Sequence, residues 1–499
     1  MRDVYRLLKE KLLAGDGIRD RAVKGSIWLF AIRGLGRGLE LIKLAVLARI
    51  LAPEDFGLMG IALLVMAAIE HFSKLGLGTA LIQRKEENVD PYLDTAWVMK
   101  LGRGAALGAV AFLAAPLFAS FFDDPRVTDL VRALAVLPML RGLFNPGIVY
   151  FKKDLEFHRQ FAFDTTGNVV NFVAALGFAA VYPSVWALVF GHLVEEVVKL
   201  GISYLLHEYR PSIRFDLPKV KELFGYGKWI TASGAVLFVL NQGDDAFVGW
   251  FLGATALGFY QMAFRFGNAP STELSQVVSN VLLPTFSKVQ QETERLRKTF
   301  QRSLQLITFA SFPAAIGVIV VAPLFVSVIL GEKWLSLVEE LQILAIWGLF
   351  RSLRPVFNNM FQAVGRPDIS TKISFARLVL MSAVIYPATA AFGTEGTAIA
   401  VTIPAALSML VGGYIAVGIV ELRVREFVVE LSYPLTSALV MGATVYYARE
   451  QSVLGTGILE LVGLILLGVI VQLLLTWTLS RTTSYDVWSS VMAAVGAVR

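Results

Sequence analysis

Apolar runs of about 20 residues recur along the chain, between Trp28 and Leu479. A helix of that length crosses the ~30 Å hydrocarbon core of a bilayer. The composition agrees, because 56% of the 499 residues are hydrophobic and only 17% are charged, whereas a soluble domain carries about 25% charged residues. The sequence therefore predicts an all-α integral membrane protein.

The lengths of these runs and the charges that flank them predict about fourteen transmembrane helices. We expect them at residues 25–50, 56–82, 93–121, 127–150, 160–181, 184–206, 224–250, 255–286, 300–330, 337–363, 370–391, 396–419, 428–448 and 454–480. The predicted parts are a cytoplasmic amphipathic arm (1–24), an N-lobe of helices 1–6 (25–206), a cytoplasmic linker (207–223), a C-lobe of helices 7–12 (224–420), and helices 13–14 with a cytoplasmic tail (421–499).

Lysine and arginine concentrate in one set of alternate loops, which includes "FKKDLEFHR", "YRPSIRFDLPKVK" and "ETERLRKTFQR". The other set, which includes "FFDDPRV" and "GTEG", carries few of them. Basic loops stay on the cytoplasmic side of a membrane. This bias predicts a multi-pass protein of the cytoplasmic (inner) membrane with both termini in the cytoplasm.

The two lobes show an internal repeat. "LAPEDFGLMGIA" aligns without a gap over "LGATALGFYQMA", and "APLFAS" is echoed later by "APLFVS". The residues paired at an offset of 201 are Trp28 with Trp229, Leu51 with Leu252, Gly57 with Gly258 and Ala62 with Ala263. The repeat unit is six helices, so the two halves have parallel topology. In transporters built from such repeats the substrate site lies between the halves.

A charged stripe lies inside the first predicted helix. Arg33, Arg37, Glu40 and Lys43 share one helix face. Arg37 is near the middle of the membrane, where an unpaired charge costs at least about 2.5–3.5 kcal/mol. Two readings remain: the cations line a cavity and bind an anionic substrate, or Arg33 and its neighbours extend to the headgroups.

At the repeat offset of 201 residues, Glu40 aligns with Asn241 and Lys43 aligns with Asp244, which Asp245 follows in the sequence. A Lys43 ion pair with Asp244 or Asp245 across the cleft is one prediction; loop carboxylates near the outer surface are the alternative. Arg265, Arg351 and Arg377 have no obvious local carboxylate, so Arg265 and Arg377 join the predicted cationic cavity. The polar and coupling candidates are Glu40, Asp164, Asn168, Asn241, Asp244, Asp245 and Glu273.

Other intramembrane charges are spaced to pair within their own helices. Glu70 with Lys74, and Glu195 with Lys199, are separated by four residues, which brings them together on one helix face. We interpret these as structural pairs.

Several function classes lack their signatures. The chain has no cysteine, no phosphate-binding G-x-x-x-x-G-K-[ST] loop and neither H-E-x-x-H nor G-x-S-x-G. The four histidines form no i,i+4 pair, and the basic loops are explained by membrane orientation. We therefore predict no catalytic residues, no metal site, no cofactor and no nucleic-acid partner.

Two stretches carry a family resemblance. "LARILAPEDFGLMGIA" followed by "FSKLGLGTALIQRKE", and "LGFYQMAFRFGNAPSTELSQVVSNVLLPTFSKVQ", resemble the first two helices and the eighth-helix region of Wzx-like polysaccharide flippases. That branch belongs to the multidrug/oligosaccharidyl-lipid/polysaccharide exporter superfamily. The resemblance covers nearly the whole chain.

The resemblance implies a monomeric transporter that flips a polyprenyl-diphosphate-linked oligosaccharide from the inner to the outer leaflet by alternating access, for lipopolysaccharide or exopolysaccharide biosynthesis. Its implied partners are that substrate, membrane lipids and the glycan polymerase machinery. The alternatives within the fold are a peptidoglycan-precursor (lipid II) flippase and a multidrug exporter. From another class, an integral-membrane glycan polymerase or ligase would be expected to carry a sizeable outer loop.

Overall fold

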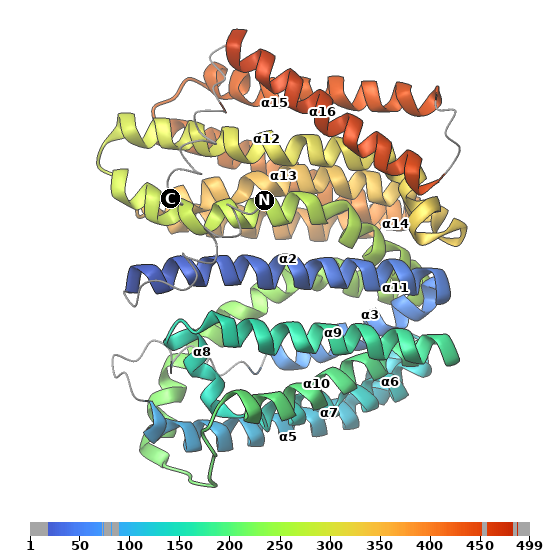
Figure 1. Cartoon of the computed structure of the whole chain (residues 1–499), viewed down its shortest axis with the longest axis vertical. Coiled ribbons are helices and arrows are strands. Elements are labelled where there is room, and N and C mark those ends of the chain that lie inside the picture. The colour runs from blue at the N-terminus through green and yellow to red at the C-terminus, as the bar shows by residue number, and fades with distance from the viewer. Residues whose placement is uncertain are drawn as a thin grey trace, which may run out of the picture. The chain divides into compact units, whose positions relative to one another are not determined.

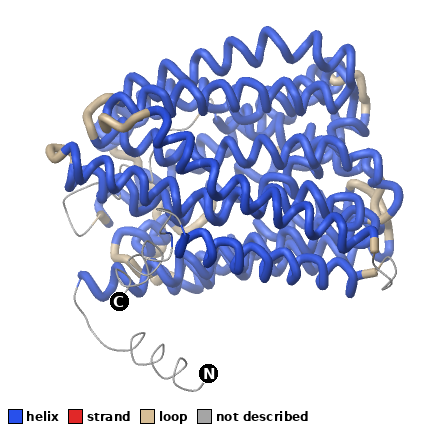
Figure 2. The backbone as a smooth tube through the Cα atoms, turned by 90° about the horizontal axis from the view of Figure 1, so that it is seen from above, coloured by secondary structure: helices blue, strands red, loops and turns tan. Residues whose placement is uncertain are grey.

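The chain is helical throughout the part that the structure describes, a computed structural model that covers residues 18–71, 73, 81, 89–451, 457–482 and 487 (Figures 1 and 2). Side chains are described except at 18–27, 29–31, 33, 219–237 and 270–281. No strand occurs in these ranges, which confirms the all-α class. The predicted arm (1–24) lies outside the described residues, apart from the helical backbone from Ile18 onward.

The chain divides into two compact units, Met1–Gly258 and Phe259–Arg499. Unit 1 contains α2 (Ile18–Ile50), α3 (Pro53–His71), α5 (Asp90–Phe121), α6 (Arg126–Leu134), α7 (Val136–Gly142), η1 (Pro146–Val149), α8 (Tyr150–Lys153), α9 (Phe157–Val181), α10 (Trp186–Leu206) and the first part of α11 (Leu217–Val289). Unit 2 contains the remainder of α11, α12 (Thr293–Phe325), η2 (Val326–Leu330), η3 (Glu332–Leu337), α13 (Val338–Ala363), α14 (Pro367–Ile419), α15 (Val424–Glu450) and α16 (Ile458–Thr482).

Two long helices contain breaks near predicted boundaries. In α11 the backbone leaves helical conformation at Gly253, with φ 84°, between the predicted helices 224–250 and 255–286. In α14 it does so at Phe392 and Gly393, where Gly393 has φ 58°, between 370–391 and 396–419. A positive φ is accessible to glycine at little steric cost, so glycine permits the chain to reverse there.

One predicted helix differs from the structure. The segment 127–150 was expected to be continuous, yet it forms α6, α7, η1 and α8. Pro138 lacks the N–H that would donate to the carbonyl four residues earlier, which interrupts the helix near Ala135. Asn145 accepts a hydrogen bond from Gly147 N and begins η1 before Pro146.

Six helices in the described part are long and apolar enough to cross a membrane. They are Asp90–Phe121, Phe238–Ala269, Thr293–Leu330, Pro367–Ile419, Val424–Glu450 and Ile458–Thr482. Many of their apolar side chains face outward, such as Leu113 (77% exposed) and Leu459 (79% exposed). Lipid covers such surfaces at no cost, so these segments fit a bilayer rather than water.

Within each unit, helix pairing positions the polar side chains described below. In unit 1, α9 packs along both α2 and α10 (Figure 1). In unit 2, α13 packs along α12 and α14. Its core includes the aromatic contacts of Phe300 with Phe357 and Phe427, with ring centroids 6.1 and 6.4 Å apart. Rigid packing around α13 holds its other face in a fixed position beside α14.

The repeat-related glycines lie at a close helix contact in unit 1. A Cβ atom added at Gly57 of α3 would overlap the carbonyl group of Ala254, and one added at Gly258 would overlap the carbonyl of Pro53. Each of these Cβ atoms would also lie 3.0–3.2 Å from the backbone nitrogen of the other glycine. Glycine removes the side chain that would hold the backbones apart, as at other close contacts between membrane helices.

Candidate functional site

The charged stripe of α2 is partly paired within its own helix. Arg37 Nη1 donates to Glu40 Oε2 at 2.9 Å, and the two side chains are 28% and 34% exposed. Glu40 therefore offsets part of the charge that Arg37 brings into the membrane. The side chain of Arg33 lies outside the described residues.

Lys43 enters a polar network that joins three helices of unit 1. Its Nζ donates to Asn171 Oδ1 of α9 at 2.7 Å, and Asn171 Nδ2 donates to Glu195 Oε2 of α10 at 2.9 Å. Glu195 Oε1 pairs with Lys199 at 2.5 Å, and His192 lies 3.6 Å from Glu195 Oε2. The predicted Glu195–Lys199 pair is confirmed. Through Asn171 it also connects to the α2 stripe.

The polar residues predicted on one face of α9 contact two different partners, the helix α2 and a side chain of α9 itself. Asn168 approaches α2, since a Cβ at Gly36 would lie 3.0 Å from its Nδ2. Asp164 instead accepts a hydrogen bond from Gln160 of its own helix at 2.6 Å. Asn168 and Asn171 thus face α2, one turn apart.

The remaining predicted polar residues lie on α11. Asp244 is buried, with 8% exposure, Asp245 is partly buried and Asn241 is exposed. The ion pair between Lys43 and either aspartate stays a prediction. The side chain of Glu273 lies outside the described residues.

Glu70 has a partner that its spacing did not reveal. Arg141 Nη1 pairs with Glu70 at 2.8 Å, and Arg141 Nε pairs with Glu196 at 2.7 Å. Arg103 adds hydrogen bonds to the carbonyl oxygens of Glu70 and Ser73. Lys74, the predicted partner of Glu70, lies outside the described residues. Arg141 therefore links α3, α7 and α10 by charge.

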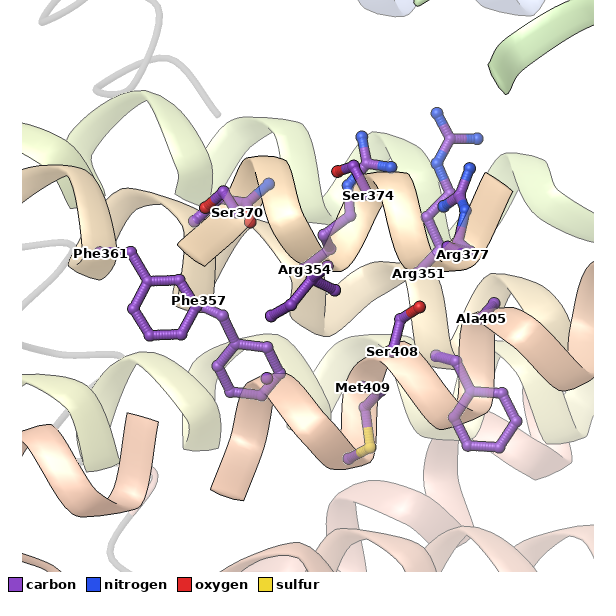
Figure 3. Close-up of a pocket in the computed structure, with 14 residues that line it drawn as sticks. Arg351, Arg354, Phe357, Phe361, Ser370, Ser374, Arg377, Ala405, Ser408 and Met409 are labelled. Atoms are coloured by element: carbon purple, nitrogen blue, oxygen red, sulfur yellow. The ribbon is translucent and has the colours of Figure 1, made fainter. Parts of the chain in front are cut away.

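Unit 2 contains a cationic pocket, which we define by three arginines and call the three-arginine pocket: Arg351 and Arg354 of α13, and Arg377 of α14 (Figure 3). It has about 520 Å³ of space, including its open side. Figure 3 shows the three guanidinium groups projecting to the same side, away from Phe357 and Met409. The other polar lining residues are Asn358, Ser370, Ser374 and Ser408.

The lining of this pocket that the structure describes carries positive charge. Its charged members are the three arginines, and no carboxylate occurs among the described lining residues. The Oγ atom of Ser370 is buried with no hydrogen-bond partner. At about 1.5 Å per residue the arginines lie about 14–18 Å along their helices from the ends at Ala363 and Pro367. Arg351 also lies over the ring of Trp347, 4.9 Å from its centroid.

The sequence identified two of these three arginines. Arg351 and Arg377 are singled out by the sequence because no aspartate or glutamate lies three or four residues from either of them, and Arg377 was predicted to bind substrate. Arg354 was missed, although its spacing of three from Arg351 places it on the same helix face. Arg265, also predicted, lies on α11, partly buried, and is not among the residues that line this pocket.

Asn171 offers a direct test of the network in unit 1. Its side chain is 4% exposed, and Asn171→Leu removes its hydrogen bonds to Lys43 and Glu195. We expect the free energy of unfolding to fall by about 1–3 kcal/mol, because buried polar groups lose their partners. Thermal unfolding of the purified chain measures this. Val173→Ala, at an exposed position of the same helix, is the control; an equal change in both variants contradicts the role of Asn171.

The sequence matches a known family. The profile of the family described as polysaccharide biosynthesis protein matches residues 46–339, more than half of the chain. The lipopolysaccharide biosynthesis protein WzxC of Escherichia coli (strain K12) is 29% identical over 388 residues, covering 77% of this chain and 78% of that protein. The teichuronic acid biosynthesis protein TuaB of Bacillus subtilis (strain 168) is 25% identical over 374 residues, covering 74% and 76%.

Solved structures show the same fold. The lipid II flippase MurJ, in an inward closed conformation, matches with a TM-score of 0.73 at 14% identity, covering 91% of this chain and 99% of that one. An inward-facing multidrug resistance transporter of the MATE family matches with a TM-score of 0.60 at 17% identity, covering 79% and 94%. At these identities the likeness concerns the fold alone.

Proposed function

Because the chain belongs to the polysaccharide biosynthesis protein family, we propose that it flips a polyprenyl-diphosphate-linked oligosaccharide from the inner to the outer leaflet of the cytoplasmic membrane. It would supply surface polysaccharide biosynthesis, as the names of its relatives WzxC and TuaB indicate for those proteins. It is a transporter, not an enzyme. Its substrate remains chemically unchanged and only changes leaflet.

The three-arginine pocket is the observation that carries this proposal. A diphosphate crossing hydrocarbon must exchange its hydration for other hydrogen bonds, and arginine offers a planar pair of donors that matches phosphate oxygens. Arg351, Arg354 and Arg377 line one pocket and would present such donors deep within the predicted transmembrane segments 337–363 and 370–391. Keeping cations at that depth is costly, so the pocket fits an anionic ligand better than a purely structural role.

The transport cycle we propose is alternating access by two six-helix lobes, with about fourteen transmembrane helices. The lobes are residues 25–206 and 224–420, joined by the cytoplasmic linker 207–223, and helices 13–14 follow. Arg33, Arg37 and Lys43 lie on the first helix of the N-lobe, and we propose that they also bind the substrate during the cycle. In the C-lobe, Arg265 would add a cation to the three arginines of the three-arginine pocket.

A deletion strain tests the function. We expect it to accumulate the lipid-linked oligosaccharide in the cytoplasmic leaflet and to lose surface polysaccharide, with both effects reversed by re-expression of the chain. Mass spectrometry of extracted lipid-linked intermediates gives the readout. Accumulation of lipid II would instead assign the peptidoglycan precursor as substrate. Sensitivity to organic cations alone would assign a multidrug exporter, and unpolymerised glycan on the outer leaflet a polymerase or ligase.

The orientation is tested by cysteine labelling, which a cysteine-free chain permits. Ile213 and Gln290 are exposed in predicted cytoplasmic segments, and Phe392 is 64% exposed at the predicted outer turn of α14. In intact cells an impermeant maleimide should label Phe392→Cys but neither Ile213→Cys nor Gln290→Cys. Permeabilised cells provide the control, since all three should then react. Labelling of Ile213→Cys in intact cells would reverse the proposed topology.

A further inference from the structure

A groove on unit 2 runs along α14, between the segment after Pro367 and the segment around Leu407. It has about 1130 Å³ of space, including its open side. One end of its lining is charged and the rest is mainly apolar. The apolar wall includes Leu407 and Val411, whose side chains are 44% and 50% exposed.

The charged end of the groove carries an excess of cations. Asp368 pairs with Lys372 at 2.9 Å and lies 3.4 Å from Arg366. One carboxylate thus faces two cations, and Arg377 lines the groove further along. This end lies in a predicted cytoplasmic connection, between the helices 337–363 and 370–391. A phosphate at the inner membrane surface would be attracted to it.

The groove adjoins the three-arginine pocket. Ile373, Arg377 and Ser408 line both spaces, and Figure 3 shows Arg377 beside Arg351. A phosphate that enters at Arg366 and Lys372 therefore meets Arg377 next, and Arg377 also belongs to the three-arginine pocket. The cations of the groove are Arg366 and Lys372 at its charged end and Arg377, which also lines the three-arginine pocket.

We propose that this groove holds the isoprenoid chain of the lipid-linked substrate while its diphosphate occupies the three-arginine pocket, an inference that rests on the proposed function. In a bilayer the lipid chains are as apolar as the groove, so hydrophobicity alone gives no affinity there. The groove instead lets the chain remain beside the hydrocarbon while the headgroup moves inward. A single groove has room for one hydrocarbon chain, as in an isoprenoid lipid, whereas a phospholipid carries two. Three guanidinium groups also provide enough donors for the two phosphates of a diphosphate, whereas a phospholipid has one phosphate.

Tryptophan substitutions in the groove test this proposal with the purified full chain. Leu407→Trp and Val411→Trp fill the apolar wall and leave the arginines in place. Leu410→Trp is the matched control, because Leu410 is 61% exposed on the same helix and lines neither space. The probes are polyprenyl diphosphate, inorganic pyrophosphate and phosphatidylglycerol. Their binding is measured by native mass spectrometry and by competition.

We expect the two groove variants to bind polyprenyl diphosphate at least about tenfold more weakly, a change of about 1.4 kcal/mol. Their binding of inorganic pyrophosphate should stay as in the wild type. The Leu410→Trp variant should bind all the probes as the wild type does. Unchanged binding of polyprenyl diphosphate would overturn the groove assignment and leave the proposed function standing. An equal loss for phosphatidylglycerol would make the occupant an ordinary phospholipid and also overturn it. No binding of pyrophosphate to the wild-type chain would overturn the pocket and the groove together.

Discussion

Arg354→Gln combined with Arg377→Gln is expected to abolish transport while the chain still inserts and folds. Each arginine is proposed to make charge-assisted hydrogen bonds to the diphosphate, worth about 1.5–3 kcal/mol each. Losing both corresponds to at least about a hundredfold weaker binding. Removing the buried charge of Arg354 relieves desolvation, so protein level and thermal stability are measured in parallel to separate lost binding from misfolding. Surface polysaccharide and accumulated lipid-linked precursor are the readouts.

The matched control for that experiment is Arg295→Gln combined with Arg423→Gln. Both side chains are strongly exposed, at 68% and 86%, and neither lines the pocket, so transport should remain normal. Arg354→Lys with Arg377→Lys should retain part of the activity, because the charge remains but the planar pair of donors is lost. Normal export by the double glutamine variant at normal protein level would remove the diphosphate site from this pocket.

Gly57→Leu is expected to eliminate transport by a different route. Even a Cβ atom at this position would overlap the carbonyl group of Ala254, so leucine must push α3 away from α11 near its break at Gly253. The proposed orientation places this contact at the outer ends of both helices, where we propose that it helps to close the outer side during the transport cycle. A bulky side chain should hold that side open and stop the cycle. Gly258→Leu should act alike, because its Cβ would overlap the carbonyl of Pro53.

Cysteine accessibility on the outer side and export of glycan measure this effect. Gly177→Leu on α9 is the control, since no atom lies within 4 Å of a Cβ added there. Overpacking costs about 1–3 kcal/mol, so protein level and thermal stability are measured in parallel to separate a blocked cycle from misfolding. A stable Gly57→Leu variant that exports normally would show that close approach of these helices is not needed for transport.

Local features were predictable from the sequence because their causes are local. Apolar run length determines which segments suit a bilayer, and the helical class followed. The breaks at Gly253 and Gly393 fall near predicted boundaries because the length that crosses a bilayer limits each helix. The Glu195–Lys199 pair follows from spacing alone, since residues four apart share a helix face. By contrast, the apolar length of the segment 127–150 predicts a single helix, whereas Pro138 interrupts the helical hydrogen bonds within it.

The sequence by itself determined the membrane class, the helical fold, the repeat that pairs Gly57 with Gly258, and the presence of cations within long apolar segments. Only the tertiary structure decided which charges meet. Asn171 lies 128 residues from Lys43, and Arg141 lies 71 residues from Glu70, so no periodicity connects them. Arg354 and Arg377 come together because α13 packs against α14. Packing between helices depends on how the side chains of two complete helix faces fit together. The spacing of residues in a single sequence does not show which faces make contact.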